Sequence, residues 1–380
     1  MTYDYMRMNQ RACTSTPERR ALIEKSMSVQ LDLVGKAHVN KEEDIHCENL
    51  IGAVSIPLGV AGPLRIKGEF VQKEVMIPLA TTEGALVASV SRGAKVISQA
   101  GGAITLIQSV GATRGPVFET GGIRESNALI SWVHAHNDEI RKEAEHTSSH
   151  LKLLGVEATM QGKYVYFRIR FDTDQAMGMN MVTIATDAIS AYIETQTNAH
   201  CVAVAGNYDI DKKPSWINMI QGRGMKCFAE VHIPAALVNE HFKVTVSDLV
   251  HTTFVKCWGG SALSGSMGFN AHFANIVAAL FLATGQDAAH VVEGALGTTL
   301  AEIDVNGDLY FAVSMPDVML GVVGGGTQLG TQQEALNIIG VTQKEELAEV
   351  LAGAVLAGEL SLLASITEHT LGASHKRLGR

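Results

Sequence analysis

A cationic loop is the first place in this sequence where side chains could do chemistry. Asp211-Lys212-Lys213-Pro214 follows a predicted strand and lies between two apolar segments. Two lysines beside an aspartate, on a loop stiffened by proline, can receive a carboxylate and stabilise a developing alkoxide. A lysine pair is usually a solvated surface turn, but the apolar flanks bring the two interpretations to nearly equal weight.

Three other side chains can donate, accept or tune protons. Glu83 falls in the first turn of a predicted apolar helix, where a carboxylate commonly balances the helix dipole. Asp287 follows Gly285-Gln286 at a predicted helix start, and an N-cap is the simpler interpretation there. His375 lies near the end of the chain, where most histidines are solvated, yet an ordinary histidine pKa of about 6.5 suits proton transfer.

A run of methionines around a glycine is the candidate anion site. Met177-Gly178-Met179-Asn180-Met181 follows a predicted strand and opens a helix, whose free N–H groups can hold a diphosphate. Methionines at a helix start also pack commonly in cores, and this interpretation is modestly favoured on local grounds. Arg92 and Arg114 are single cations that are more often surface residues than anion clamps.

Familiar cofactor and metal motifs do not occur in the sequence. There is no G-x-G-x-x-G, no G-x-x-x-x-G-K-[ST] and no H-E-x-x-H, so a Rossmann domain or P-loop has no local support. No Cys/His cluster has metal-ligand spacing, and no metal is expected. Five cysteines without a C-x-x-C pair argue against a disulfide framework and favour a reducing cytoplasm.

The elements that must position these residues predict a mixed helix and sheet fold. Between residues 103 and 205 the pattern predicts a β-α-β-β-α-β order, which is the ferredoxin-like split arrangement. Its strands and helices are expected at 104–110, 116–119, 128–148, 152–159, 164–171, 180–197 and 201–205, with a turn at Gln161-Gly162.

The rest of the chain is predicted to be rich in helix. Thr81 or Thr82 is expected to cap a helix that runs through Ile97 and ends at Gly101-Gly102. A hairpin is predicted over 303–313 with its turn at Asn306-Gly307. Further helices are expected at 247–256, 270–284, 287–296 and 344–371, the last with a candidate break near Gly358.

Composition excludes several classes of protein. Hydrophobic residues make up 46% of the chain, which permits a large core and argues against disorder. The formal net charge is −9 and no long Lys/Arg run appears, so nucleic-acid binding is not expected. The N-terminus does not read as a signal peptide. The most apolar stretches, 276–283 and 352–358, fall short of the roughly 20 residues of a membrane span, so a soluble protein is expected.

Taken in order, a series of short runs resembles the class I 3-hydroxy-3-methylglutaryl-coenzyme A (HMG-CoA) reductases. The resemblance extends from about Glu48 to Arg380. The matching runs are ENLIG (48–52), PLGVAGPL (57–64), TTEGAL (81–86), TRGP (113–116), MGMNM (177–181), GNYDIDKKP (206–214), GRG (222–224), NAHFANIV (270–277), GQD (285–287), VGGGT (323–327), AGELSL (357–362) and Ser374-His375.

The resemblance implies a fold and an assembly. It implies a large helix-rich α/β domain (48–114 and 206–380) for catalysis and dimerisation, with an inserted ferredoxin-like cofactor-binding domain (115–205). Residues 1–47 match the family only loosely, but Thr16 and Pro17 predict a helix over 14–28, so an N-terminal helical arm is expected there. The active site of such enzymes lies between subunits, so a homodimer or a higher homo-oligomer is expected. The membrane region of the larger family members is not expected here.

The resemblance also implies a reaction. It is the four-electron reduction of (S)-HMG-CoA to (R)-mevalonate and coenzyme A with two NADPH, in the mevalonate pathway of isoprenoid biosynthesis. Lys212 would stabilise the oxyanion, Glu83 would donate a proton, Asp287 would tune both, and His375 would protonate the thiolate of coenzyme A. Substrate contacts are implied for Arg92, Arg114, Asp211, Lys213, Lys256 and Asn275, and cofactor contacts for Asp174, Gln175, Met177, Gly178, Met179, Asn180 and Arg380.

Two departures from the family pattern concern the cofactor. Gln175 stands where relatives usually carry aspartate, and Gly379 replaces a side chain near the cofactor phosphate, so NADH stays a second candidate cofactor. One alternative is NAD-dependent oxidation of mevalonate, although the TTEGAL and DKKP runs favour the biosynthetic direction. A non-catalytic acyl-CoA-binding protein is the other alternative.

Overall fold

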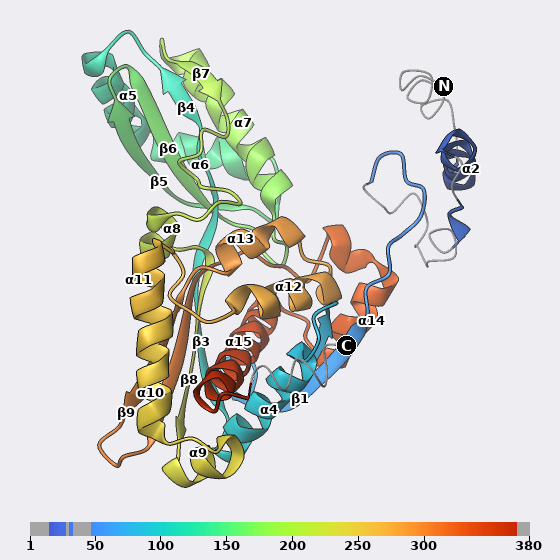
Figure 1. Cartoon of the computed structure of the whole chain (residues 1–380). Helices are drawn as coiled ribbons and strands as arrows, with labels where there is room; N and C mark the ends of the chain where they lie inside the picture. Colours follow the sequence, from blue (N-terminus) through green and yellow to red (C-terminus); the bar gives the residue numbers. More distant parts are fainter. Residues whose placement is uncertain (1–14, 28–29, 33–46, 371–380) are drawn as a thin grey trace.

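A computed structural model describes residues 15–27, 30–32 and 47–370 of the chain. Near its N-terminal end, helix α2 (Thr16–Met27) is the described part of the expected arm. Figure 1 shows α2 lying to the side of the main body. A hydrogen bond from Arg20 Nη1 to the carbonyl of Ile51, 3.0 Å long, joins this helix to the segment that leads into the body.

The buried apolar side chains of the main body form two principal clusters, and each cluster is the core of one unit of the fold. We call residues 117–203 the small unit, and residues 58–114 together with 216–367 the large unit. Figure 1 shows the small unit above the large one. The expected combination of a helix-rich mixed unit with a smaller ferredoxin-like unit is confirmed.

The small unit has the predicted β-α-β-β-α-β order, with one difference. The first helix is two helices, because the chain bends at His136, whose ring lies 2.8 Å from the carbonyl oxygen of Trp132 and stacks on its indole. The strands lie in the order β7-β4-β6-β5. The elements are β4 (Val117–Glu119), α5 (Ile123–Ala135), α6 (Asn137–Glu145), β5 (Lys152–Gln161), β6 (Tyr164–Asp172), α7 (Met179–Gln196) and β7 (His200–Ala203).

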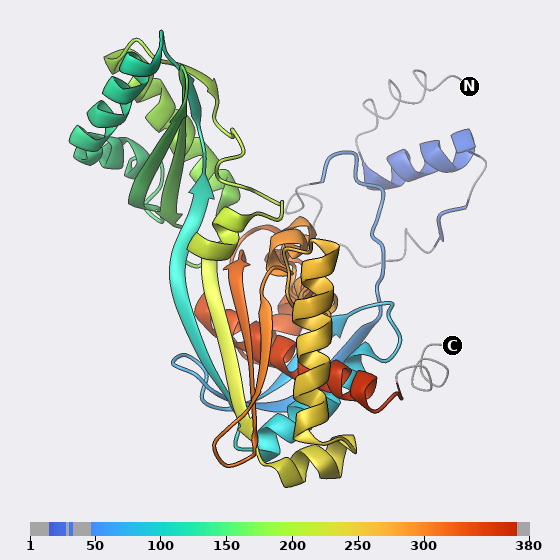
Figure 2. The ribbon, with the colours of Figure 1, turned by 60° about the vertical axis from the view of Figure 1, so that its left-hand side comes forward.

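Two long strands connect the units. Strand β3 (Ala103–Arg114) pairs with β8 (Arg223–Ile233) over most of its length and with β6 at its end. Figure 2 shows β3 and β8 rising together from the large unit towards the small one. The ladder continues through β10 (Leu309–Val318) to β9 (Thr298–Ile303), which form the predicted hairpin around Asn306-Gly307. The remaining strands are β1 (Leu58–Lys67) and β2 (Glu74–Ala80).

Helix α15 (Lys344–Thr367) is the core of the large unit. It is long and apolar enough to span a membrane by length and composition, which corrects the expectation that no stretch would be, but 83% of its most apolar window is buried. Burial on all sides is typical of a core helix. The break expected near Gly358 is wrong, because α15 is one continuous helix through this position. The glycine is explained by close packing instead, since a Cβ there would lie 2.8 Å from Ile276 of α12.

The other helices of the large unit surround α15 and the sheet. Helix α10 (Val246–Thr253) continues without interruption into a π-helical segment, η2 (Phe254–Gly260), so this helix is longer than predicted. The others are α4 (Leu86–Gln99), α8 (Trp216–Gln221), α9 (Ala235–Phe242), α11 (Ser261–Ser264), α12 (Phe273–Thr284), η3 (Ala288–His290), α13 (Val291–Gly294), η4 (Gly325–Gln328) and α14 (Gly330–Ile339).

The start of α4 differs from the prediction. The helix begins at Leu86, after Ala85 adopts a left-handed conformation with φ of 72°, and no side chain caps it. Thr81 accepts the backbone N–H of Glu83 instead, at 2.9 Å. Glu83 therefore lies in the turn before the helix and not in its first turn. The predicted end at Gly101-Gly102 is confirmed.

Candidate functional site

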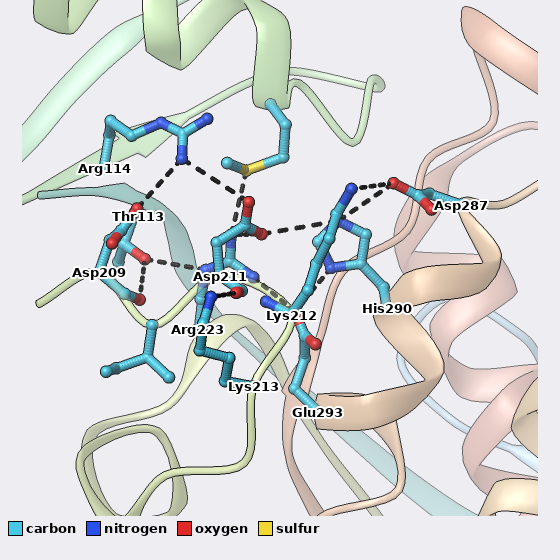
Figure 3. Close-up of polar contacts among 12 residues, drawn as sticks. Thr113, Arg114, Asp209, Asp211, Lys212, Lys213, Arg223, Asp287, His290 and Glu293 are labelled. Atoms are coloured by element: carbon cyan, nitrogen blue, oxygen red, sulfur yellow. Dashed lines mark hydrogen bonds and ion pairs between the residues drawn. The ribbon is translucent and has the colours of Figure 1, made fainter. Parts of the chain in front are cut away.

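The cationic loop and the start of η3 come together at one ion pair. Lys212 Nζ lies 2.7 Å from Asp287 Oδ2, and both side chains are partly open to solvent. Figure 3 shows the two side chains facing each other from opposite sides of the site. The backbone of Lys212 has a φ of 57°, in the left-handed region that residues other than glycine rarely adopt. Backbone strain of this kind is found most often at functional sites.

Asp287 has two roles in this arrangement. Its Oδ1 accepts the backbone N–H of Ala289 at 3.0 Å, so the predicted N-cap is confirmed. Partial burial alone would raise the pKa of Asp287. The hydrogen bond from Lys212, the N–H of Ala289 and the charge of His290 outweigh that effect and lower the pKa of this carboxyl. Asp287 is therefore an anion at neutral pH, which keeps Lys212 paired.

A buried layer lies directly beneath this ion pair. Glu293 Oε1 accepts three donors: His290 Nδ1 at 2.6 Å, Arg223 Nη1 at 2.8 Å and the backbone N–H of Lys212 at 3.2 Å. The side chains of Glu293, His290 and Arg223 are all fully buried. Because the Lys212 backbone is bound to this carboxylate, the buried layer fixes the strained loop that presents the lysine.

Arginines connect the buried layer to the rest of the loop. Arg223 Nη2 lies 2.9 Å from Asp211 Oδ1, and Arg114 Nη1 lies 3.2 Å from Asp209 Oδ2 and 3.6 Å from Asp211 Oδ2. Asp211 is thus held between two guanidinium groups (Figure 3). The ammonium of Lys213 donates a hydrogen bond to the carbonyl oxygen of Asp211, at 3.0 Å.

The carboxylates of Asp211 and Glu293 and the ring of His290 lie close enough together to share a cation. The guanidinium of Arg223 already contacts Asp211 Oδ1 and Glu293 Oε1, the oxygens that a cation would use. The positive charge at this point therefore comes from the chain itself. The expectation of a metal-free enzyme stays a prediction.

Glu83 has its own partner. Asn275 Nδ2 donates to Glu83 Oε1 at 3.2 Å, so α12 positions this carboxylate. Within the described part of the chain, Glu83 forms no hydrogen bond or ion pair with Lys212 or Asp287. The predicted tuning of Glu83 by Asp287 stays a prediction.

Two cations implied for the substrate lie on other elements. Arg92 of α4 donates to the hydroxyls of Ser361 and Ser365 on α15, at 3.0 and 2.5 Å, and its guanidinium lies over the ring of Phe242. Burial lowers the pKa of Arg92, and Glu368 opposes that shift. These contacts make Arg92 a link between helices. Lys256 lies in the π-helical segment and lines a surface hollow together with residues 260–261 and 264–268.

The candidate cofactor loop occupies the start of α7, as predicted. Gly178 precedes the helix with a φ of 85°, no side chain caps it, and a side chain there would lie 2.4 Å from Thr173. Packing against Thr173 thus explains this glycine without a ligand. Met179 is buried with its sulfur 3.0 Å from Arg223 Nη2, whereas Asn180 is exposed at the helix start.

The residues just before this loop have structural partners. Asp174 is paired with His150, 2.9 Å away, and Gln175 Oε1 accepts the backbone N–H of Lys344 at 2.7 Å. Gln175 therefore contacts the start of α15, a contact that the sequence did not indicate. Met177 is partly buried against the core of the small unit. His375 and Arg380 lie outside the described residues.

Sequence reasoning missed the buried layer itself. Arg223 lies in a matching run that implies no role for it, and His290 and Glu293 belong to none of the matching runs. A usable signal was present: 287, 290 and 293 are spaced by three, which places them on one side of consecutive helical turns. The pairing of Arg223 with Glu293 had no such signal, because 70 residues separate them.

Comparisons with known proteins agree with the order of motifs. A sequence model described as hydroxymethylglutaryl-coenzyme A reductase matches residues 15–380. The chain is 48% identical over 368 residues to the 3-hydroxy-3-methylglutaryl-coenzyme A reductase of Methanothermobacter thermautotrophicus, covering 95% of this chain and 92% of that protein. It is 45% identical over 378 residues to the enzyme of that name from Haloferax volcanii, covering 97% and 94%.

Solved structures resemble the fold at lower identity. The class II 3-hydroxy-3-methylglutaryl-CoA reductase from Streptococcus pneumoniae, bound to NADPH in open conformations, superposes with a TM-score of 0.70 at 17% identity. The match covers 96% of this chain and 97% of that one. At this identity the likeness concerns the fold.

Proposed function

The chain belongs to the hydroxymethylglutaryl-coenzyme A reductase family, and on that premise we propose that it reduces (S)-HMG-CoA to (R)-mevalonate and coenzyme A with two NADPH. The observation that carries the proposal is the ion pair between Lys212 and Asp287, held on a strained loop above a buried charged layer. We further propose that the chain belongs to class I, because its TTEGAL, DKKP and GQD runs resemble those of class I. We also propose that it forms a homodimer in the cytoplasm.

Lys212 acts on the substrate carbonyl in this proposal. As a hydride reaches the thioester carbon, negative charge develops on the carbonyl oxygen, and an ammonium group fixed in advance stabilises it. Asp287 keeps Lys212 charged and oriented between turnovers. The substrate carboxylate finds its cations in Arg114 and Lys213, with Asp211, Asn275, Lys256 and Arg92 lining or supporting the substrate site.

Proton transfer is divided between two groups. Collapse of the first tetrahedral adduct breaks the carbon–sulfur bond, and His375 gives a proton to the departing thiolate. The aldehyde then accepts a second hydride, and Glu83 gives its proton to the resulting alkoxide. Asn275 orients Glu83 for this step. The sum consumes one thioester, two NADPH and two protons.

NADPH supplies the two hydrides when bound. The start of α7 suits its diphosphate, since no side chain of the described residues caps the backbone N–H groups there and Asn180 is exposed beside them. Asp174, Gln175, Met177, Gly178, Met179 and Arg380 complete the proposed cofactor set. Gln175 and Gly379 leave the choice between NADPH and NADH to experiment.

The test is an absorbance assay at the nicotinamide band, run with HMG-CoA and either NADPH or NADH. Two NADPH are expected to be consumed for each free thiol released, and acetyl-CoA serves as the control substrate. Reaction only in reverse, from mevalonate with NAD⁺ and coenzyme A, would establish the degradative alternative. Tight binding of HMG-CoA without any cofactor consumption would establish a non-catalytic protein and contradict the proposal.

A further inference from the structure

We propose that His290 is a positioning residue that takes over the carboxylate of Asp287 when Lys212 turns to the substrate. The inference rests on the proposed function, because it concerns the lysine assigned to the substrate carbonyl. It adds to that site a buried histidine and its partner Glu293, to which neither the motifs nor the comparisons assign a role.

The geometry places one oxygen between two cationic groups. Asp287 Oδ2 lies 2.7 Å from Lys212 Nζ and 3.7 Å from His290 Nε2, so only the lysine is within hydrogen-bond reach in this state. His290 Nε2 is buried and has no hydrogen-bond partner among the residues that the structure describes. An unpartnered buried nitrogen is costly, and a short approach of Asp287 would satisfy it.

The orientation of the imidazole is fixed from the other side. His290 Nδ1 lies 2.6 Å from Glu293 Oε1, so Nδ1 carries a proton and Nε2 points at the carboxylates. Asp287 Oδ2 at 3.7 Å and Asp211 Oδ1 at 3.9 Å face Nε2. With a proton on Nε2 the ring attracts both oxygens, whereas a lone pair there would repel them.

Three carboxylates face the ring, those of Asp211, Asp287 and Glu293. Arg223 pairs with the first and third of them, Arg114 also pairs with the first, and Lys212 pairs with the second. When Lys212 moves its charge to the carbonyl oxygen, Asp287 loses its cation. The imidazolium then becomes the nearest replacement, which keeps Asp287 ionised and leaves Lys212 free for the substrate.

The experiment compares His290→Leu with His290→Gln, using mevaldehyde as well as HMG-CoA. Mevaldehyde reduction needs no thiolate proton, so its pH dependence is free of His375. His290→Leu is expected to lower kcat for both substrates about 30-fold, with KM changed by less than about threefold, because misplacing a catalytic group by about 1 Å can cost two orders of magnitude. His290→Gln keeps a neutral donor of similar length and is expected to recover kcat to within about fivefold.

A second readout separates positioning from structure. If the protonated ring is what holds Asp287, mevaldehyde turnover by the wild type should fall as the pH rises, and this alkaline limb of the pH profile should be absent in His290→Gln. Glu349→Gln is the control, since it removes a buried carboxylate of α15 whose hydrogen bonds go to backbone N–H groups of the loop after β1. It is expected to lower the melting temperature while leaving the pH profile and kcat unchanged.

Each outcome decides the question. In an Asp287→Asn background, His290→Leu is expected to cost little more, because its partner is already gone. A full additional loss there, or equal losses for Leu and Gln with an unchanged alkaline limb, would overturn the inference. If His290→Leu does not fold, the limb in His290→Gln decides alone. Absence of turnover by the wild type would remove the proposed function, whereas wild-type turnover with unaffected His290 variants would remove only this inference.

Discussion

Helix α15 and the buried layer beneath Lys212 both contain buried carboxylates, but the groups that neutralise the negative charge differ between the two places. Glu349 accepts backbone N–H groups of Glu69 and Val71, at 2.8 and 2.7 Å, and has no cationic partner within 15–27, 30–32 and 47–370. Glu293 accepts from an arginine, a histidine and the backbone of Lys212. One carboxylate is satisfied by fixed dipoles and the other by groups that can carry charge or move.

The difference separates structural from functional burial. Backbone dipoles cannot titrate, so Glu349 joins the loop after β1 to the core permanently. Glu359, also on α15, does the same for the residues before α12 by accepting the N–H groups of Ala271 and His272. The partners of Glu293 include a titratable ring and the segment that carries the proposed catalytic lysine. A change in charge at that site is therefore expected to act on the backbone of Lys212, which is hydrogen-bonded to Glu293.

The largest effect on turnover is expected at Lys212, the residue that the buried layer around Glu293 holds in place. Lys212→Ala removes the ammonium that stabilises the oxyanion and should lower kcat by about 1,000-fold, at the upper end for the loss of one such donor. Because Lys212 is partly exposed and its backbone N–H contact to Glu293 is kept, the melting temperature should change little. Steady-state rates and a thermal melt measure both, and substantial retained turnover would remove Lys212 from the mechanism.

A matched pair of substitutions tests the comparison directly. Glu293→Gln and Glu349→Gln each replace a buried carboxylate by an amide that turns a donor towards existing donors, so each should lower the free energy of unfolding by about 2 kcal/mol. Only Glu293→Gln should also lower kcat, by about tenfold, because it releases the Lys212 backbone. Denaturant titrations and rates at saturating substrate provide the two measurements. Equal kcat values in the two variants would show that the partners of Glu293 matter no more for turnover than those of Glu349.

The sequence could predict the fold because its signals are local. The hairpin at Asn306-Gly307, the end of α4 at Gly101-Gly102 and the β-α-β-β-α-β order follow from short patterns of turn residues and apolar spacing. The errors arise where tertiary contacts override such signals. Gly358 suggested a break, but it allows α12 to approach α15 closely.

The site could be predicted only in part. The cap at Asp287 and the cationic loop were visible as motifs, whereas their 2.7 Å contact joins residues 75 positions apart and depends on the whole large unit. Arg223, Glu293 and His290 were hidden because a buried charge looks like a surface charge in sequence. Gln175 was misleading for a related reason, since its contact with Lys344 crosses from the small unit to α15.

Asp317 is a third kind of buried carboxylate and sharpens the comparison through pH. It is fully buried, with one oxygen accepting from Asn218 at 2.6 Å, and burial raises its pKa to about 8 against the effect of Arg223. A folded-state pKa above the unfolded value of about 3.9 means that stability is greatest at low pH and is lost as pH rises. Between roughly pH 5 and 7 this group should remove about 1 kcal/mol per pH unit.

Asp317→Asn should therefore abolish that slope, since an amide does not titrate. The measurement is the free energy of unfolding in denaturant at several pH values, in the wild type and the variant. The two curves should converge at low pH, where Asp317 is already neutral in both states. A slope of the opposite sign in the wild type, with stability rising as pH rises, would show that Arg168 and Arg223 hold this carboxyl as an anion.

The smallest effect is expected at Gln175, where a structural contact and a proposed cofactor contact compete. Gln175→Ala removes one hydrogen bond to the start of α15 and should cost about 1 kcal/mol of stability. Gln175→Glu keeps an acceptor of the same length and adds a charge, so it should retain stability. If the side chain only holds the start of α15, KM for NADPH should stay within about twofold in both variants, because the hydrogen bond that changes goes to Lys344 and not to the cofactor. A larger rise confined to Gln175→Glu would place the added charge beside the cofactor and assign Gln175 to both regions.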